Sequence, residues 1–475
     1  MAHHKLEADY LIVGTGAVGM AFADTMLTEN TDATIIMVDR HHMPGGHWND
    51  AYSFVNLHQP SAFYGVSSKP LGTGLKDEVG LNKGLMELAS GAEVCAYFDQ
   101  VMKHTFLPSG RVQYFPMCDY EGDGKFRGIS SGDTCEVDVK KKVVDATYFK
   151  TSVPATHTPS YTIDEGLTRV PLNALPNIHD IPSAYVIVGG GKTGIDAILW
   201  LLEKGVDPDL IKWIMPRDAW LHPRENTQPA AEFFKASIGA QARQMECIAN
   251  AESIDDLFAR LEAAGCLVRI DQSVKPEMYH GATISIPEME QLRRVKNVIR
   301  LGRVKHITEN EIQFEKGTLP TDKDALYVDC SARAVPVTEQ YPVFDGNLIT
   351  IQTVRTIQPV FSGSLVAYVE AHYDSERQKN DICTVVPLPN HDTDWIICQA
   401  GMMMNQMRWS QEKEMRAWIK DNRLDGFTRL VADADTSDPE NMEILMTMKN
   451  NGAPAMMKLQ QFIGEITSSG PKYPH

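Results

Sequence analysis

Two glycine-rich turns constrain the fold of this 475-residue chain more than any other feature. The segments are DYLIVGTGAVGMAFADTML, which begins at Asp9, and AYVIVGGGKTGIDAILWLL, which begins at Ala184. Each has an apolar run rich in β-forming residues, then closely spaced glycines, then a pattern suited to an amphipathic helix. Two such strand–turn–helix units predict an α/β protein with two doubly wound, Rossmann-like domains and helical additions.

The second turn contains the letters GKT, which also occur in the phosphate-binding loop of many NTPases. That loop requires GxxxxGK[ST], so a glycine must stand five residues before Gly191. The residue there is Val186, inside the expected strand. The backbone amides that would wrap a triphosphate are missing, and the sequence excludes a P-loop NTPase.

The first turn follows the dinucleotide-binding pattern GxGxxG at Gly14, Gly16 and Gly19. These glycines permit a tight turn, close approach of a pyrophosphate and close packing of the helix on the strand. Asp39 follows about 20 residues later, where a carboxylate accepts hydrogen bonds from ribose hydroxyls. Together these features predict a nucleotide site, and the adjacent Arg40 is a further candidate for it.

The second turn has the same pattern at Gly189, Gly191 and Gly194. The next apolar run, LIKWIM, is followed by Arg217, where a site that prefers NAD often carries an acid. An arginine there suits the 2′-phosphate of NADP, although a solvated surface arginine is the plainer alternative. Lys192 and Thr193 are candidates for phosphate contacts, and the sequence leaves open whether either is only a residue of the turn.

The composition is that of an ordinary globular protein, with 43% hydrophobic and 23% charged residues. The 62 acidic residues outweigh the 45 basic ones, and the net charge of −17 argues against nucleic-acid or anionic-membrane binding. We expect no signal peptide, and no apolar run approaches the roughly 18 residues of a membrane span. Eight cysteines without a CxxC pair are typical of free thiols, so we expect a cytoplasmic protein.

The segment after Asp39 reads RHHMPGGHWNDAYSFVNLHQPSAFYGV. It contains a GGxW motif at Gly45–Trp48 and an LHxP motif at Leu57–Pro60. With these motifs and the two turns in this order, residues 8–335 resemble the flavin-containing monooxygenase superfamily, which includes YUCCA-type and Baeyer–Villiger enzymes. The remainder of the chain offers little to match.

The resemblance implies a flavoprotein that uses FAD, NADPH and O₂ to oxygenate a small organic substrate through a flavin C4a-(hydro)peroxide. It implies that FAD is held by Gly14, Gly16, Gly19 and Asp39, with Gly46 and Trp48 nearer the flavin. It implies that NADPH is held by Gly189, Gly191, Thr193, Gly194 and Arg217. His58 occupies the region of the flavin's reactive edge in relatives, so we assign it as a donor to the flavin adduct, with Gln59 as a weaker candidate. The alternative for His58 is a packed histidine bonded to a backbone carbonyl.

Two departures from the superfamily pattern concern the reaction. The interval EGLTRVPLNALPNIHDIPSA before the second turn does not fit the usual fingerprint FxGxxxHxxx[YF]. The ATG motifs at the domain crossings are replaced by DATYF at 145–149 and DCSAR at 329–333. These departures keep open a reductase or NAD(P)H oxidase that transfers no oxygen. A third interpretation is a flavoprotein that binds nucleotide without turnover.

The order of segments predicts three parts of the chain. They are an FAD-binding part at 1–165, an NADPH-binding part at 166–335 with a helical insertion near 228–285, and a C-terminal part at 336–475 that completes the FAD domain and ends in a helical tail. We also expect a strand at 143–150, a connector at 151–161, helix over 230–265 ending at Gly265, short strands over 296–330 and helix over 410–431.

Other features receive plainer interpretations. The pair HH at 41–42 and the loop NHDTD at 390–394 lack the spacing of metal ligands, so we expect no metal site. The run GMMMNQM at 401–407 is typical of a core or a soft pocket wall. The sequence does not identify the substrate, and it leaves the oligomeric state open, with a homo-oligomer among the options.

Overall fold

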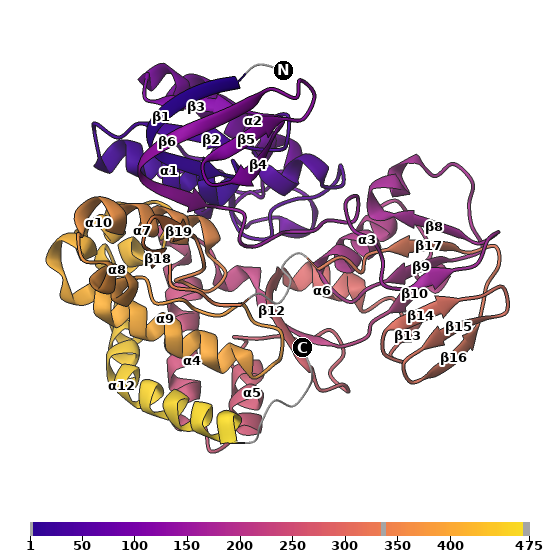
Figure 1. The fold of residues 1–475 in the computed structure, drawn as a ribbon. Helices are drawn as coiled ribbons and strands as arrows, with labels where there is room; N and C mark the ends of the chain where they lie inside the picture. Colours follow the sequence, from indigo (N-terminus) through magenta and orange to yellow (C-terminus); the bar gives the residue numbers. More distant parts are fainter. Residues whose placement is uncertain (1–2, 334–338, 469–475) are drawn as a thin grey trace.

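The computed structural model describes residues 3–333 and 339–468. Its two largest sheets lie at the top and at the right of Figure 1, and a helical part lies at the lower left. Strand pairing alone separates the two sheets, because no strand of one pairs with a strand of the other in the described residues.

The first sheet combines strands from residues 3–145 with two short strands from residues 344–350. Five strands run parallel in the order β19-β6-β1-β2-β3. Their bounds are β1 His3–Val13, β2 Ile35–Val38, β3 Val112–Phe115, β6 Thr134–Asp145 and β19 Leu348–Thr350. The other strands are β4 Cys118–Gly122, β5 Lys125–Gly128 and β18 Phe344–Asp345, which pair in antiparallel fashion with each other or with the sheet edge. On this sheet, helix α1 (Ala17–Glu29) packs against α7 (Pro359–His372).

The second sheet is wholly parallel, in the order β13-β10-β9-β17-β8. Its strands are β8 Thr168–Pro171, β9 Tyr185–Val188, β10 Ile211–Ile214, β13 Val298–Ile299 and β17 Leu326–Asp329, and its helices are α3 Lys192–Glu203 and α6 Ile286–Leu292. A smaller sheet beside it contains β7 Thr162–Ile163, β14 Val304–Ile307, β15 Glu311–Phe314 and β16 Gly317–Pro320. In each large sheet a glycine turn joins a central strand to a helix, and the predicted fold class is confirmed. The short strands expected over 296–330 are confirmed as well, as β13 to β17.

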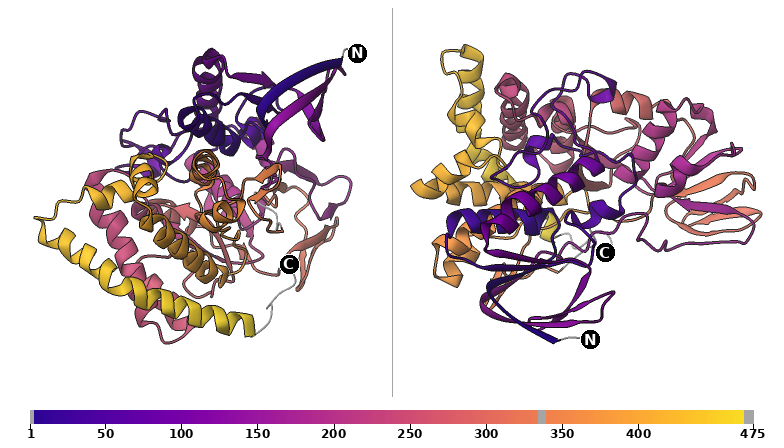
Figure 2. Two further views of the ribbon diagram at one scale, coloured as in Figure 1. Left: turned by 60° about the vertical axis from the view of Figure 1, so that its left-hand side comes forward. Right: turned by 90° about the horizontal axis from the view of Figure 1, so that it is seen from above.

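The helical part joins the insertion of the second unit to the end of the chain. Helices α4 (Phe234–Asn250) and α5 (Ile254–Ala263) pack against α9 (Asp394–Gln411) and α12 (Pro439–Ser468), as Figures 1 and 2 show. Their shared core is made of fully buried apolar side chains, among them Leu257, Trp395, Leu459 and Phe462. The remaining elements are α2 Gly91–Val101, α8 Glu376–Ile382, α10 Lys413–Asp421, α11 Thr428–Ala432 and the parallel strand pair β11 Ala219–Pro223 and β12 Met278–Ile284. Among the described helices, none combines the length and apolar character of a membrane-spanning segment.

Two expected elements end earlier than the sequence pattern suggested. The strand expected at 143–150 stops at Asp145, because the Asp145 carboxylate accepts from the Thr147 N–H at 2.7 Å and turns the chain. The helix expected over 410–431 is interrupted after α10, where Gly426 adopts φ +69° and Asp425 caps the next turn. The helix over 230–265 is two helices, α4 and α5, and Gly265 ends the second at φ +65° as predicted.

Candidate functional site

The first glycine turn is packed too tightly for side chains. Gly14 adopts φ +97°, and a Cβ on Gly19 would lie 2.1 Å from the Gly14 carbonyl oxygen. The short 3₁₀ helix η1 (Gly46–Asp50) begins directly over this turn, since a Cβ on Gly46 would lie 2.9 Å from the Gly16 Cα. The turn and the GGHW motif, about 30 residues apart in sequence, therefore form one glycine-lined cradle.

Asp39 stands at the end of β2 with its carboxylate buried against this cradle. The Thr15 N–H and hydroxyl donate to Oδ2 at 2.5 and 2.9 Å, and the His41 N–H and Nδ1 approach Oδ1 at 2.8 and 2.7 Å. Burial acts to raise the pKa of Asp39, but the bonds from His41 and Thr15 outweigh it and hold the pKa below its usual range. The carboxylate is therefore ionised at neutral pH.

Two other predicted residues of the first site lie differently. Arg40 points away from the cradle, with its exposed guanidinium 3.7 Å from Asp119 on β4. Trp48 lies in the cradle wall, where its Nε1 donates to the Tyr64 hydroxyl at 2.7 Å. The structure thus brings Trp48 together with Gly16 and Gly46, and leaves Arg40 outside.

The second glycine turn repeats the tight geometry of the first. Gly189 adopts φ +139°, and a Cβ there would lie 2.3 Å from the Cys330 carbonyl oxygen. A Cβ on Gly194 would lie 2.2 Å from the Gly189 carbonyl oxygen. A Cβ on Gly191, by contrast, would meet no described atom within 4 Å. The middle glycine therefore faces open space at the N-terminus of α3, where backbone N–H groups point outward.

Lys192, the first residue of α3, is already paired. Its ammonium group forms an ion pair with Asp196 one turn later, and both side chains are largely buried. The second oxygen of Asp196 accepts from the Tyr52 hydroxyl at 2.6 Å. Tyr52 belongs to the segment that follows the GGHW motif, so this contact ties the first unit to α3. Thr193 lies half-buried beside Lys192.

Three arginines gather beyond the end of β10. The Arg217 guanidinium donates to Asn390, at 2.8 Å to the side-chain oxygen. Burial, and then the positive charges of Arg303 and Arg333, lower the pKa of Arg217. None of the three forms an ion pair with a carboxylate in residues 3–333 and 339–468. His280 approaches the same Asn390 oxygen at 3.2 Å, so the close hydrogen-bond partner of Arg217 is neutral, while the carboxylates of Glu277 and Asp394 act on Arg217 without forming an ion pair.

His58 lies where the two units meet. The buried Arg224 fixes its backbone, donating from Nε to the His58 carbonyl at 2.9 Å and from NH2 to Glu288 at 2.8 Å. Burial, and then the positive charges of Lys192 and Arg224, lower the pKa of His58 well below its usual range. The ring is neutral at physiological pH and makes no hydrogen bond to another described residue, while Gln59 follows it, half-buried.

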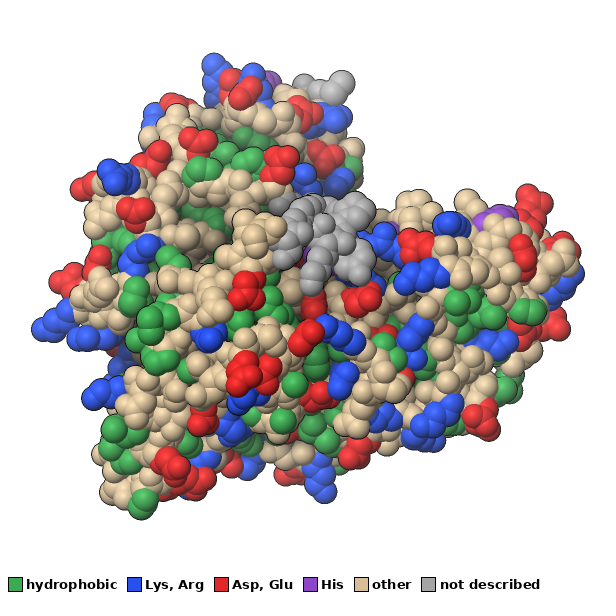
Figure 3. Space-filling view, turned by 90° about the horizontal axis from the view of Figure 1, so that it is seen from below, with side chains coloured by type: hydrophobic (Ala, Val, Ile, Leu, Met, Phe, Trp, Pro, Cys, Tyr) green, Lys and Arg blue, Asp and Glu red, His purple; other side chains and the backbone are tan. Residues whose placement is uncertain are grey.

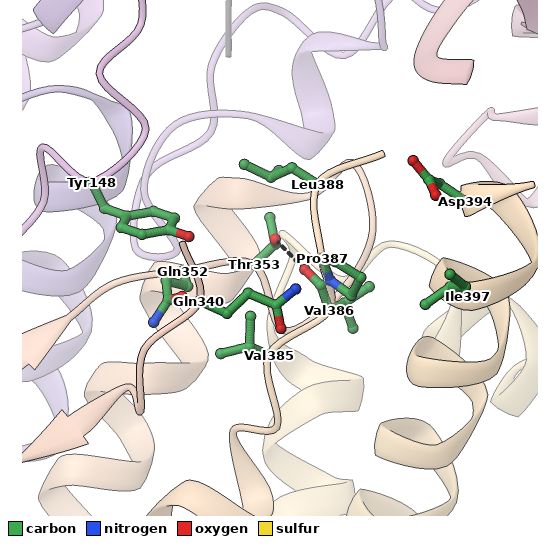
Figure 4. Close-up of a pocket in the computed structure, with 10 residues that line it drawn as sticks. All are labelled: Tyr148, Gln340, Gln352, Thr353, Val385, Val386, Pro387, Leu388, Asp394 and Ile397. Carbon is green, nitrogen blue, oxygen red and sulfur yellow. Dashed lines mark hydrogen bonds between the residues drawn. The ribbon is translucent and has the colours of Figure 1, made fainter. Parts of the chain in front are cut away.

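A cavity of about 420 Å³ opens near the carboxyl ends of β6 and β19. Tyr148 follows β6, Gln352 and Thr353 follow β19, and the opposite wall comes from the segment before α9 (Figure 4). The Thr353 hydroxyl donates to the Val386 carbonyl at 2.8 Å, which holds that wall in place. The lining is mainly apolar, with Asp394 at one end. Ligands of parallel α/β sheets bind at this edge of the strands.

The outer surface mixes both signs of charge. On the face drawn in Figure 3, acidic and basic side chains are interspersed and hydrophobic side chains form small groups.

The structure shows no group of three or more His, Cys, Asp or Glu side chains arranged to hold a metal ion within the described ranges.

Several residues of the site carried no signal in the sequence. The contact of Tyr52 with Asp196 and that of Arg224 with His58 form only through the fold, because in each case the two partners lie far apart along the chain. The sequence marks His41 only as half of the HH pair, yet its ring faces Asp39 while His42 is exposed. A local signal did exist for His41, since it stands two residues after the acid that ends β2.

Comparison with known proteins gives relatives of this chain as well as structural neighbours. No family model matches the chain. It is 46% identical over 422 residues to the uncharacterized protein Rv2000 of Mycobacterium tuberculosis, covering 88% of this chain and 78% of that protein. The uncharacterized protein Mb2023 of Mycobacterium bovis matches with the same values.

Solved structures are similar at much lower identity. Cyclohexanone-bound cyclohexanone monooxygenase is 14% identical, with a TM-score of 0.48 over 77% of this chain and 88% of that chain. A flavin-containing monooxygenase from Stenotrophomonas maltophilia is 14% identical, with a TM-score of 0.40 over 80% and 100%. A bacillithiol disulfide reductase from Staphylococcus aureus is 11% identical, with a TM-score of 0.42 over 77% and 98%.

The similarity to the mycobacterial proteins extends through most of the sequence. Nearly half of the aligned residues are identical over 88% of this chain. This chain therefore belongs to the family of these mycobacterial proteins, whose fold here is a pair of α/β units with glycine turns, joined by a helical part.

Proposed function

We propose that this protein is an FAD- and NADPH-dependent oxidoreductase, and more specifically a monooxygenase that acts on a small organic molecule with O₂. One observation carries the proposal: the segment that follows the GGHW motif, which lies over the first glycine turn, is docked on the helix that follows the second turn. Tyr52 donates to Asp196 on α3 at 2.6 Å, and His58 lies within reach of the Lys192 charge. Two dinucleotides held by the two turns would thus extend toward one place.

The residues of the first site fit FAD. The cradle of Gly14, Gly16 and Gly46 leaves bare backbone where a pyrophosphate approaches. The ionised Asp39 suits the ribose hydroxyls of the adenosine half. The Tyr114 hydroxyl on β3 is buried beside Thr15 and Asp39, so it adds a polar group to the same wall of the cradle. Gly19 and Trp48 complete the set of residues that would hold the cofactor.

The residues of the second site fit NADPH. Gly191 faces open space at the start of α3, as a pyrophosphate requires. Gly189, Thr193 and Gly194 shape that turn. Arg217, Arg303 and Arg333 form no close ion pair in the described residues, and burial with their mutual repulsion outweighs the charges of Glu277 and Asp394 on Arg217, so a 2′-phosphate would add favourable negative charge. Lys192 would have to leave Asp196 before it could contact a phosphate.

The chemistry would take place beside His58. When bound, FAD supplies the redox chemistry, taking a hydride from NADPH and reacting with O₂. The neutral His58 ring can donate one hydrogen bond without carrying charge, because burial and two nearby cations keep it unprotonated. Arg224 holds the His58 backbone in position. The mainly apolar cavity at the ends of β6 and β19, which is lined by other residues, offers room for a small substrate. Gln59 is a second candidate donor.

The proposal is tested with the purified full-length protein. Its absorption spectrum should show bound flavin, and NADPH should reduce that flavin faster than NADH. A panel of small amines, sulfides and ketones is then supplied with O₂, and oxygenated product and H₂O₂ are both measured. We expect a substrate that gains one oxygen atom per NADPH consumed. A protein that binds no flavin, or whose flavin NADPH does not reduce, would contradict the proposal.

His58→Ala provides the residue-level test. Removing the ring should raise the yield of H₂O₂ per NADPH and lower the yield of product, because an unsupported oxygen adduct decays without transfer. Gln59→Ala is the matched neighbour and should change the ratio less. Fully coupled turnover in His58→Ala would remove His58 from the mechanism.

A reductase or oxidase that transfers no oxygen is the second candidate. The interval 165–184, where the fingerprint is absent, forms β8 and a short 3₁₀ helix at Leu172–Asn177 instead. If NADPH oxidation yields only H₂O₂, or a reduced acceptor such as a quinone, with every substrate in the panel, this candidate replaces the monooxygenase.

A further inference from the structure

The His41 ring bridges two carboxylates at the first glycine turn. Its Nδ1 lies 2.7 Å from Oδ1 of Asp39 and its Nε2 lies 3.0 Å from Oδ2 of Asp50. Neither ionised carboxylate can donate a hydrogen, so both bonds form at once only when both ring nitrogens carry a proton. The arrangement therefore favours the imidazolium form of His41.

This bridge connects the two halves of the cradle. Asp39 ends β2, whereas Asp50 ends the short helix η1 that begins over Gly16. The His41 backbone is fixed as well, because its N–H donates to Asp39 at 2.8 Å and its carbonyl accepts from Met117. The ring is about four-fifths buried, so solvent screens the two contacts only partly.

The other groups around the ring leave His41 as the one that titrates near neutral pH. The titratable and charged groups on the elements packed around it are Asp39, Arg40, His47, Asp50, Tyr114, Cys118 and Asp119. Burial, and then the charge of His41, lower the pKa of His47 to about 4, so it is neutral above that pH. Burial raises the pKa of Tyr114 and of Cys118, so both are also neutral. Arg40 pairs with Asp119 at the surface.

We infer that His41 is a positioning residue for the dinucleotide of the first site: as an imidazolium it holds Asp39 in the orientation that receives the ribose and reduces the negative charge facing the pyrophosphate. This inference rests on the proposed binding of FAD. With His41 protonated, the bridge of one cation and two carboxylates carries one net negative charge. Without that proton it carries two, beside a cofactor with an anionic pyrophosphate.

The sign of the pH effect follows from this charge count. The bonds and charges of Asp39 and Asp50 raise the pKa of His41, although burial opposes them. For FAD binding the reference is the FAD-free folded protein, so the favourable contribution is complete below the raised pKa of His41 in that form and is lost as pH rises through the still higher pKa in the FAD-bound form. FAD should bind more weakly on the alkaline side, by about tenfold if bound FAD shifts the His41 pKa by one unit.

The experiment measures FAD affinity against pH with flavin-free full-length protein, by quenching of flavin fluorescence between about pH 5.5 and 9. NMR of the ring protons follows the His41 titration in the absence of FAD. We expect the dissociation constant to rise about tenfold across the His41 titration. His41→Gln keeps one donor but no charge, so its affinity should equal that of the alkaline wild type at every pH.

His42→Gln is the matched control, because His42 is the exposed neighbour of His41. It should keep the wild-type pH profile. Asp50→Asn should shift the His41 titration to lower pH, a change that a merely structural role of His41 would not produce. Thermal unfolding of the flavin-free variants confirms that each is folded.

The outcomes separate this inference from the proposed function. FAD binding with a flat pH profile, or with the same slope in His41→Gln, would overturn the role of His41 and leave the proposed function standing. No FAD binding at any pH would overturn both.

Discussion

The two glycine turns have nearly the same backbone and opposite charge at the end of the following strand. In both, a Cβ on the third glycine would lie within 2.2 Å of the carbonyl oxygen of the first. After the first turn, Asp39 is buried with Thr15 and His41 as its partners. After the second, Arg217 lies with other arginines and with a neutral asparagine.

The difference shows which part of such a site is general and which is specific. The turn presents backbone N–H groups to a pyrophosphate, and this task is the same for any dinucleotide. The strand end discriminates, because an acid accepts from ribose hydroxyls whereas an arginine cluster attracts a further phosphate. The His41 ring bridges two carboxylates at the first strand end, whereas Arg217 at the second strand end forms no close ion pair in the described residues.

The largest effect should come from the feature that the turns share. Gly19→Ala and Gly194→Ala each force a methyl group against a backbone oxygen, at 2.1 and 2.2 Å. Each should lower the free energy of unfolding by about 3 kcal/mol or more, measured in urea. Gly452→Ala, on helix α12 with no atom within 4 Å of the new Cβ, is the control and should stabilise by about 0.5–1 kcal/mol. If either Gly19→Ala or Gly194→Ala left the free energy of unfolding unchanged, the two turns would not be equivalent.

The next effect should separate the two strand ends. Arg217→Ala removes a charged donor, so the dissociation constant of NADPH should rise about 10- to 100-fold. NADH, which lacks the 2′-phosphate, should bind as it does to the wild type. Anaerobic titration of the wild type and the variant with NADPH and with NADH measures both dissociation constants. An equal loss for NADH and NADPH would mean that Arg217 supports the fold of the site rather than the phosphate.

Asp39→Asn tests the acidic strand end, and the expected loss of FAD affinity is about tenfold. The pKa of Asp39 is already lowered in the FAD-free protein, so the contribution of Asp39 to FAD affinity is lost only as pH falls through that lowered value. Wild-type protein should therefore begin to release FAD only below about pH 4 for this reason. The variant should lack that acid transition. Retention of the transition in Asp39→Asn would assign it to another carboxylate.

The smallest effects should come from the middle glycines. A Cβ on Gly16 would lie 3.6 Å from the Gly46 Cα, and a Cβ on Gly191 would meet nothing within 4 Å. Gly16→Ala and Gly191→Ala should each change stability by no more than about 0.5 kcal/mol. The first should weaken only FAD and the second only NADPH, each several-fold, as measured by fluorescence titration. If Gly16→Ala weakened NADPH binding, or Gly191→Ala weakened FAD binding, the two turns would not serve separate cofactors.

The sequence predicted those parts of the molecule that depend on local spacing. The glycine patterns with their flanking apolar runs were enough to predict both α/β units, and Gly265 was enough to predict the end of a helix. The site residues placed on the turns follow from the same spacing. Their roles as ligands of FAD and NADPH stay predictions until they are measured.

Contacts between distant segments escaped sequence analysis for a physical reason. The Arg224 guanidinium reaches the His58 carbonyl and Glu288, and neither partner has a spacing that marks it. The sequence gives no sign of the arginine cluster either, because Arg303 and Arg333 follow different strands and come together only in the folded chain. The prediction of a strand over 143–150 was wrong beyond Asp145 for a local reason. The Asp145 carboxylate accepts from the Thr147 N–H, and this bond redirects the backbone.

The docking of Tyr52 on Asp196 also has a mechanical consequence. Besides this bond, Phe54 stacks on Trp200 at 5.0 Å, Arg224 donates to the His58 carbonyl, and the Ser285 hydroxyl donates to the Leu81 carbonyl. Because these contacts come from several segments, loss of one of them should leave the two units docked. A Tyr52→Phe variant should therefore keep both units in contact, and its free energy of unfolding, measured in urea, should fall by about 1.5–3 kcal/mol, the contribution of one hydrogen bond to a charged group.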